Sequence, residues 1–219
     1  MQKLTPLNQP VSLSKMAYDA IRRFILSGQM KHDEIYNEMG IAKELGISRT
    51  PVREALLELS SQGLITFLPR KGLKVNKLTD RDIDEIFEVR KAIELAAVER
   101  ISKNADTFDL SLIETSLEDM RKAAADKNYL RFMDLDLSFH MAFCELTGNR
   151  RMLAIMQNIH DMIHMLGTQS LAKDDRMEEA IREQENILEA VRHGKTMEAR
   201  VLMEAHLERS KASAEKATG

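Results

Sequence analysis

The sequence contains four prolines, and no proline follows Pro69. Proline interrupts helices and glycine weakens them, so a long segment with none of the first and few of the second is suited to long helices. Apolar residues also recur at helical spacing through this segment. We therefore expect the chain from residue 78 onward to be all-helical, and the fold as a whole to be mainly α.

The charges divide the 219-residue chain at the same place. Residues 1–77, here called the head, carry 12 Lys and Arg against seven Asp and Glu, a net charge of +5. Residues 78–219, here called the body, carry 20 against 28, a net charge of −8. A basic module joined to an acidic one is typical of a nucleic-acid-binding domain attached to a second domain. We therefore expect two domains that meet near Lys77.

The head has the pattern of a winged helix-turn-helix. Three helices are expected, at about 14–28, 37–45 and 48–63, with Gly46 at the bend between the second and third. Two short segments rich in β-forming residues, 64–68 and 73–75, flank a basic turn and predict a hairpin wing. The first ten residues, with two prolines and no periodic apolar pattern, are expected to form a short loose arm.

A helix-turn-helix places the start of its second helix in the major groove, where donor groups reach base edges and phosphates. Hydroxyl and guanidinium groups gather at that position, and the turn of the expected wing adds two more cations. The alternative is that the arginines are solvated charges that pair with Glu54 or Glu58. The predicted DNA-binding residues include Ser48, Arg49, Thr50, Arg53, Arg70 and Lys71.

Six helices are expected in the body, which predicts an antiparallel bundle. Thr79 followed by acidic residues predicts the cap of the first helix, and glycines separate several of the others. Residues 213–219 are expected to be a disordered tail. The expected helices span about 79–104, 109–127, 129–147, 150–167, 173–193 and 196–216.

One combination of body residues suggests a metal site. Asp136 and His140 are four residues apart in a predicted helix and share a face, while His206 lies on the inward side of the last helix. An Asp and two His of this kind can hold a divalent cation with coordination positions left for water or a ligand. The alternative is that Asp136 hydrogen-bonds locally and both histidines are ordinary bundle residues.

The segment from Gly46 to Leu56, Gly-Ile-Ser-Arg-Thr-Pro-Val-Arg-Glu-Ala-Leu, resembles the signature of the GntR family of bacterial transcription regulators. This resemblance implies DNA binding by the matching Arg49, Thr50 and Arg53 and by the wing glycine, Gly72. Lys31-His32 departs from the family, whose members commonly have Pro-Gly there, so only the geometry of that turn is in question.

The body resembles the FCD effector domain of the FadR subfamily within that family, in its shorter, six-helix, VanR-like branch. The resemblance implies an effector-binding and dimerisation domain, and many such domains bind a metal through one Asp and three His. Asp136, His140 and His206 match three of these ligands, and Gln184 stands at the fourth. A carboxamide is a poorer ligand for zinc than imidazole, so a site for zinc or a similar divalent metal ion is expected to be weakened.

Two interpretations of Gln184 follow. Either a cation binds weakly through the other three residues, or the site has lost its metal and Gln184 hydrogen-bonds the effector directly. His160 and His164 are four residues apart; they would supply a substitute ligand or line a surface or pocket. The resemblance also implies that Arg90 points into the effector cavity, where it would clamp a carboxylate, and the alternative for Arg90 is a surface ion pair with Glu88 or Glu94.

Together these observations predict a ligand-responsive transcription regulator. It would bind a palindromic double-stranded DNA operator as a homodimer and sense a small-molecule effector, by resemblance an organic acid. The alternative is a metal-dependent enzyme fused to a DNA-binding head. We expect no catalytic residues, because Cys144 has no identifiable base and suits a core. One cysteine, no signal sequence and no long apolar run predict a cytoplasmic protein without membrane contact.

Overall fold

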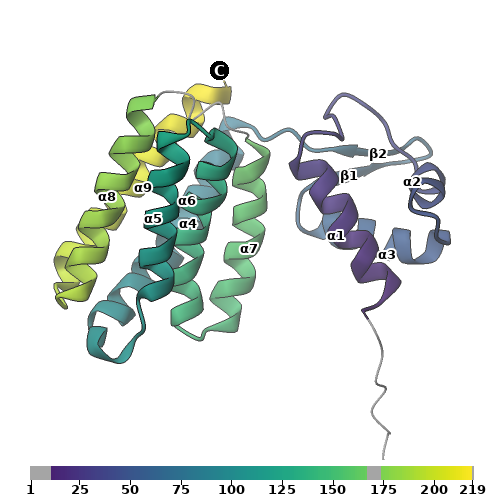
Figure 1. Ribbon diagram of the computed structural model, residues 1–219. Coiled ribbons are helices and arrows are strands. Elements are labelled where there is room, and N and C mark those ends of the chain that lie inside the picture. Colours follow the sequence, from purple (N-terminus) through teal and green to yellow (C-terminus); the bar gives the residue numbers. More distant parts are fainter. Residues whose placement is uncertain (1–10, 167–173, 219) are drawn as a thin grey trace, which may run out of the picture. The chain divides into compact units, whose positions relative to one another are not determined.

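The computed structural model describes residues 11–166 and 174–218. The chain divides into two compact units, Met1–Lys77 and Leu78–Gly219, and we describe each by itself (Figure 1). The expected N-terminal arm lies outside the described residues. No helix of the described ranges is long and apolar enough to cross a membrane.

The described part of the head, residues 11–77, contains three helices and a two-stranded sheet: α1 (Leu13–Leu26), α2 (Glu38–Leu45), α3 (Arg49–Ser61), β1 (Ile65–Leu68) and β2 (Gly72–Val75). Helix α2 ends at Gly46, whose φ of 66° lies in the left-handed region that glycine adopts without strain. Helix α3 packs against α1, α2 and β1 through buried residues such as Leu56 and Leu59. The predicted winged helix-turn-helix is confirmed.

The wing is tied to the segment that precedes α2. Strands β1 and β2 pair antiparallel, with Ile65 opposite Val75 and Leu68 opposite Gly72. The backbone of Tyr36 exchanges two hydrogen bonds of 2.8 Å with that of Leu73. Gly72 therefore comes so close to this segment that a Cβ atom would lie 2.1 Å from the Tyr36 carbonyl oxygen, and its φ is 127°. Both facts require glycine at this position.

Six α helices form the described part of the body, together with a short 3₁₀ turn at Ala105–Thr107. Figure 1 shows these helices aligned side by side. Thr79 caps the first of them through a capping box with Asp82. The helices are α4 (Asp80–Ser102), α5 (Ser111–Ala125), α6 (Tyr129–Leu146), α7 (Arg150–Met165), α8 (Asp174–Arg192) and α9 (Thr196–Thr218).

The core of the body is mainly apolar, and most of its buried charged and histidine side chains gather in one polar cluster. Helix α4 packs against α9 and α6, and α8 packs against α9 and α5. Fully buried phenylalanines, Phe132, Phe139 and Phe143, lie on α6, which is the most apolar helix of the bundle. Because α4, α6, α8 and α9 all contribute side chains to the polar cluster, the packing of these helices determines its geometry.

The expected disordered tail is wrong for residues 213–218. Helix α9 continues to Thr218, and Ala214 is buried against the apolar core. The Ser213 hydroxyl donates to the Arg209 carbonyl oxygen at 3.1 Å, which is compatible with a helix. The small residues of this segment therefore extend the last helix. The expected last residue of α7, Gly167, and the expected first residue of α8, Lys173, lie outside the described residues.

Candidate functional site

The buried polar cluster of the body is centred on two histidines. The Nε2 atoms of His140, on α6, and His206, on α9, lie 3.1 Å apart, and both side chains are almost completely buried. A hydrogen bond between two ring nitrogens needs one proton, so one Nε2 atom donates and the other accepts. Burial lowers the pKa of His206 and thereby favours its neutral, accepting form.

A carboxylate holds the other nitrogen of each histidine. His140 Nδ1 lies 2.5 Å from Glu94 Oε2, and His206 Nδ1 lies 2.6 Å from Glu183 Oε2. Burial would raise the pKa of Glu94, but His140 and Arg90 outweigh it and hold the pKa at about 2. Burial would also raise the pKa of Glu183, but its contacts with His206 and with two arginines outweigh burial and lower it. Both carboxylates are therefore ionised and fix each ring with its Nε2 atom turned toward the other.

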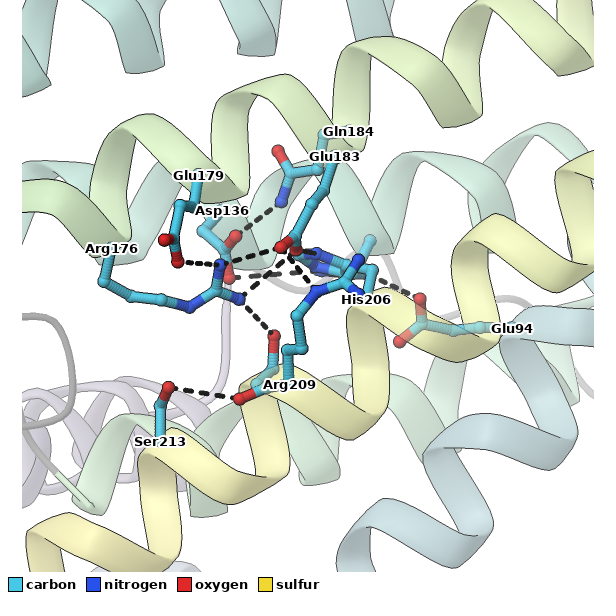
Figure 2. A network of polar contacts seen from close by, with 11 residues as sticks. Glu94, Asp136, Arg176, Glu179, Glu183, Gln184, His206, Arg209 and Ser213 are labelled. Atoms are coloured by element: carbon cyan, nitrogen blue, oxygen red, sulfur yellow. Dashed lines mark hydrogen bonds and ion pairs between the residues drawn. The ribbon is translucent and has the colours of Figure 1, made fainter.

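Asp136 completes the group predicted from the sequence. One ligand atom each of Asp136, His140 and His206 lie within 4.8 Å of one another. Gln184, on α8, is fully buried beside them, and its Nε2 atom donates to Asp136 Oδ1 at 2.5 Å. Figure 2 shows this contact at the edge of the cluster. The structure thus brings together all four residues at which a metal site was expected.

The donor set is compatible with a divalent cation. Imidazole Nε2 atoms backed by carboxylates, together with one aspartate, form an arrangement that binds metals in many proteins. The amide oxygen of Gln184 is buried and has no hydrogen-bond partner among the described residues. Rotation of the amide by half a turn would exchange its oxygen and nitrogen, so this oxygen can reach the place where Nε2 now contacts Asp136.

A cavity of about 40 Å³ adjoins the cluster. Asp136 and Arg90 line it together with apolar residues such as Phe87 and Met133. The Arg90 side chain is 2% exposed, and its Nε atom donates to Glu94 Oε1 at 2.6 Å. One of its terminal nitrogens, Nη2, has no partner within the described part of the chain. Arg90 thus lines a cavity and pairs with Glu94, and this ion pair is buried rather than on the surface as the alternative had it. The expected role of Arg90 as a carboxylate clamp stays a prediction.

A second arginine lines the same cavity. Arg176, on α8, binds Glu183 at 3.2 Å and donates to the Ser210 hydroxyl at 3.3 Å. Glu183 also accepts from Arg209 Nε at 2.6 Å and contacts His206. Figure 2 shows these side chains converging on Glu183. A contact at Arg176 in the cavity is therefore connected through one carboxylate to the histidine pair.

The predicted DNA-binding residues lie on the surface of the head. Ser48, Arg49, Thr50 and Arg53 are exposed at the start of α3, and Ser48 is the N-cap residue of that helix. Arg70 and Lys71 are exposed at the tip of the wing, where Arg70 has a φ of 62°. The structure brings four of the predicted residues together along one groove of about 460 Å³: Arg49, Arg53, Arg70 and Gly72.

The other candidates from the sequence, His160, His164 and Cys144, are not part of the group formed by Asp136, His140 and His206. His164 Nε2 contacts Asp134 Oδ1 at 2.9 Å, and the imidazole rings of His160 and His164 are 6.4 Å apart. Cys144 is buried in the apolar core, and burial raises the pKa of its thiol to about 12. A thiol that stays protonated is a poor nucleophile.

Sequence reasoning missed several residues of the body cluster. Glu94 was considered only as a surface partner of Arg90, and Arg176 and Arg209 were not considered at all. Their signal is weak in a single sequence, because Glu94 pairs across 46 residues with His140 and Arg176 across 34 residues with Ser210. Local indications were the spacing of Arg90 and Glu94, four residues apart on one helix, and that of Arg176 and Glu183, seven residues apart on another.

Comparison with known proteins matches both units. Residues 13–75 match the model described as bacterial regulatory proteins, gntR family, and residues 85–209 match that of the FCD domain. An uncharacterised HTH-type transcriptional regulator, YdhC of Bacillus subtilis, is 32% identical over 190 residues, which cover 85% of this chain and 84% of that protein. The gluconate operon transcriptional repressor of Bacillus licheniformis is 34% identical over 142 residues, 64% of this chain and 57% of the repressor.

Solved structures share the fold. A putative transcriptional regulator GntR from Rhodococcus sp. RHA1 superposes with a TM-score of 0.80 at 23% identity, covering 92% of this chain and 96% of that one. Escherichia coli McbR/YncC gives a TM-score of 0.80 at 20% identity, covering 94% of this chain and 99% of that one. Both likenesses extend over the head and the body.

Proposed function

The chain is a DNA-binding transcription regulator that belongs to the GntR family and carries an FCD domain, and we propose that its body controls DNA binding by sensing a small carboxylate. The observation that carries this proposal is that Arg90 lines the cavity beside the histidine pair and that its buried Nη2 atom has no partner in the ranges that the structure describes. A buried guanidinium with a free donor suits a carboxylate, which can accept two parallel hydrogen bonds.

The cavity supports a ligand with a small anionic group. Its volume, about 40 Å³, is enough for a few atoms, and its two arginines, Arg90 and Arg176, offset the negative charge of such a group. Asp136 lies on the same wall. An anion at this place would therefore lie beside Asp136 and beside the ion pairs Arg90–Glu94 of α4 and Arg176–Glu183 of α8.

We further propose that a divalent cation binds through Asp136, His140 and His206, with Gln184 as a weak fourth ligand through its amide oxygen. Such a cation would supply a fixed positive charge for the effector. Glu94 and Glu183 orient the two rings, and the Gln184 amide oxygen, which no described residue hydrogen-bonds, supports its part in the set. Zinc binds carboxamides more weakly than imidazole, so moderate affinity is expected.

On the head, we propose that α3 enters the major groove and the wing contacts the phosphate backbone. Arg49 and Arg53 are exposed on one side of α3, and both line the groove that Arg70 also borders. Arg70 adopts a left-handed conformation that costs about 1 kcal/mol for a residue other than glycine. Strained backbone conformations of this kind often occur at functional positions, so the presence of Arg70 at the wing tip supports a role for its positive charge in binding phosphates.

We propose that the protein acts as a homodimer on a palindromic operator, because two identical heads read two half-sites related by the same twofold axis. The effector would act by favouring one arrangement of the two heads over the other. We do not propose the alternative of a metal-dependent enzyme, because the relatives are transcriptional regulators and the Cys144 thiol is buried and protonated.

One experiment tests the proposed effector response and the proposed dimer. Full-length protein is titrated with the DNA upstream of its own gene, with and without a panel of small carboxylates, and its mass in solution is measured by light scattering. We expect a dimer whose DNA affinity one of the carboxylates changes, and loss of that change in Arg90→Lys. Unaltered binding in every carboxylate, or turnover of one of them, would contradict the proposal.

A further inference from the structure

Glu38 contacts both arginines that we place in the major groove. Arg53 Nη1 lies 3.0 Å from Glu38 Oε1, and Arg49 Nη2 lies 3.5 Å from Glu38 Oε2. The arginine side chains are 62% and 67% exposed, whereas the Glu38 side chain is only 16% exposed. A largely covered carboxylate of the first helix of the motif thus joins two exposed cations of the second.

The position of Glu38 in α2 is itself fixed. It is the first residue of that helix, and Asn37 caps the helix by accepting a hydrogen bond from the Gly40 amide at 2.7 Å. The partial positive charge at a helix N-terminus stabilises a carboxylate. Glu38 is therefore a fixed anchor, while each arginine is a long side chain that would otherwise sample many rotamers.

The arginines need such an anchor. Arg49 and Arg53 are one turn apart on α3, so their like charges repel each other when nothing lies between them. A guanidinium has five N–H donors, and the contact with Glu38 uses only part of them. The remaining donors stay available for base edges, and bidentate recognition of a guanine requires that the guanidinium plane is already oriented.

The Glu38 carboxylate is also expected to lower the affinity of the head for DNA. Phosphate contacts supply most of the sequence-independent binding of DNA, and a negative charge in the groove opposes them. Glu38 lines the groove that Arg49, Arg53 and Arg70 also line. The expected net effect is weaker binding to any DNA and better discrimination between sequences.

We propose that Glu38 is a positioning residue that determines DNA specificity: it orients Arg49 and Arg53 for base contacts and lowers their attraction for phosphates. This inference rests on the proposed placement of the two arginines in the major groove. Glu38 itself touches no base in the proposal and acts through the arginines.

The test compares two duplexes with full-length protein. One is the tightest-binding duplex that the unmodified protein selects from a randomised library, and the other has the same composition in shuffled order. In Glu38→Gln we expect tighter binding of the shuffled duplex and a ratio of the two affinities reduced by about tenfold, the size of one good base contact. Glu44→Gln, an exposed charge change on the same helix, should leave the ratio unchanged.

Two further variants make the outcome decisive. In the Arg49→Gln/Arg53→Gln background, Glu38→Gln should not change the ratio of the two affinities further, because the arginines through which Glu38 acts are absent. Glu38→Asp keeps the negative charge, but its shorter side chain moves the carboxylate away from the two arginines. The ratio of the two affinities should therefore fall, while the affinity for the shuffled duplex should not rise. This variant also tests the proposal if Glu38→Gln fails to fold by circular dichroism.

The failures of the two proposals are distinguishable. If the Arg49→Gln/Arg53→Gln protein discriminates as well as the unmodified one, the placement of α3 in the groove is wrong. If the arginines matter but folded Glu38→Gln and Glu38→Asp both keep the full ratio, only the role of Glu38 is overturned.

Discussion

The imidazole rings of His140 and His206 are stacked, with centroids 5.1 Å apart and an interplanar angle of 20°, although 66 residues separate them in the chain. A carboxylate hydrogen-bonds the Nδ1 atom of each ring, Glu94 for His140 and Glu183 for His206. These contacts fix the orientation of both rings and so direct the two Nε2 atoms toward each other.

Gln184→His should convert the weak fourth ligand into a strong one. Zinc prefers imidazole to a carboxamide, so we expect tighter zinc binding, measured by competition with a chromogenic chelator. Asn186→His places an exposed histidine on the same helix and is the matched control. Equal zinc affinity in the unmodified protein and in Gln184→His would contradict the assignment of the fourth ligand.

Arg90→Met should destabilise the body by about 3 kcal/mol, because it removes one partner of a buried ion pair and leaves the Glu94 carboxylate with less compensation. Urea denaturation followed by far-ultraviolet circular dichroism measures this change. Arg81→Met removes an exposed pair with Glu85 of the same spacing on the same helix and should have little effect. A similar denaturation midpoint in both variants would mean that the buried pair contributes no more than the exposed one.

Gly72→Ala should weaken DNA binding and destabilise the head by about 1–3 kcal/mol, because a Cβ atom collides with the Tyr36 carbonyl oxygen and the positive φ is strained. Gly28→Ala is the control, since that glycine also has a positive φ but no neighbouring atom within 4 Å of the added Cβ. Amide hydrogen exchange over residues 64–75 measures the effect. Equal protection in the two variants would show that the close approach is unimportant.

Arg49→Ala and Lys71→Ala should weaken DNA binding in different ways. Loss of Arg49 should cost about 1–3 kcal/mol on the selected operator and much less on other sequences, because it removes a base contact. Loss of Lys71 should weaken all sequences alike and reduce the slope of log affinity against log salt by about one, as expected for a phosphate contact. Fluorescence anisotropy over a range of salt concentrations measures both quantities, and an exchange of the two patterns would reverse our assignment of α3 and the wing.

The Cys144 thiol should resist alkylation at neutral pH in the folded protein and react in urea. Burial raises its pKa from 9.0 to about 12, so between these values the unfolded chain releases a proton that the folded chain keeps. The free energy of unfolding should therefore fall as the pH rises through this range. Mass spectrometry after a pulse of iodoacetamide measures the reactivity, and rapid labelling without urea would contradict the buried position.

The sequence predicted those parts of the molecule that depend on local patterns. Gly46 marks the turn of the helix-turn-helix, and Thr79 with Asp82 marks the start of α4, because capping and positive φ values have local signals. Asp136 and His140 were recognisable as a pair because they are one turn apart. Contacts between distant segments have no such signal, which is why the backbone bridge from Tyr36 to Leu73 and the role of Arg176 became visible only in the structure.

The buried polar cluster draws one or more members from each of α4, α6, α8 and α9, whereas apolar residues elsewhere hold these helices together. The apolar packing that holds the bundle together is thus largely separate from the polar cluster. Under the proposed function, a single exchange at a position such as Gln184 would change which small molecule the cluster recognises, while the apolar core would keep the helices in place. Because the head is a separate compact unit, such an exchange would give a regulator that answers to a new metabolite and reads the same DNA.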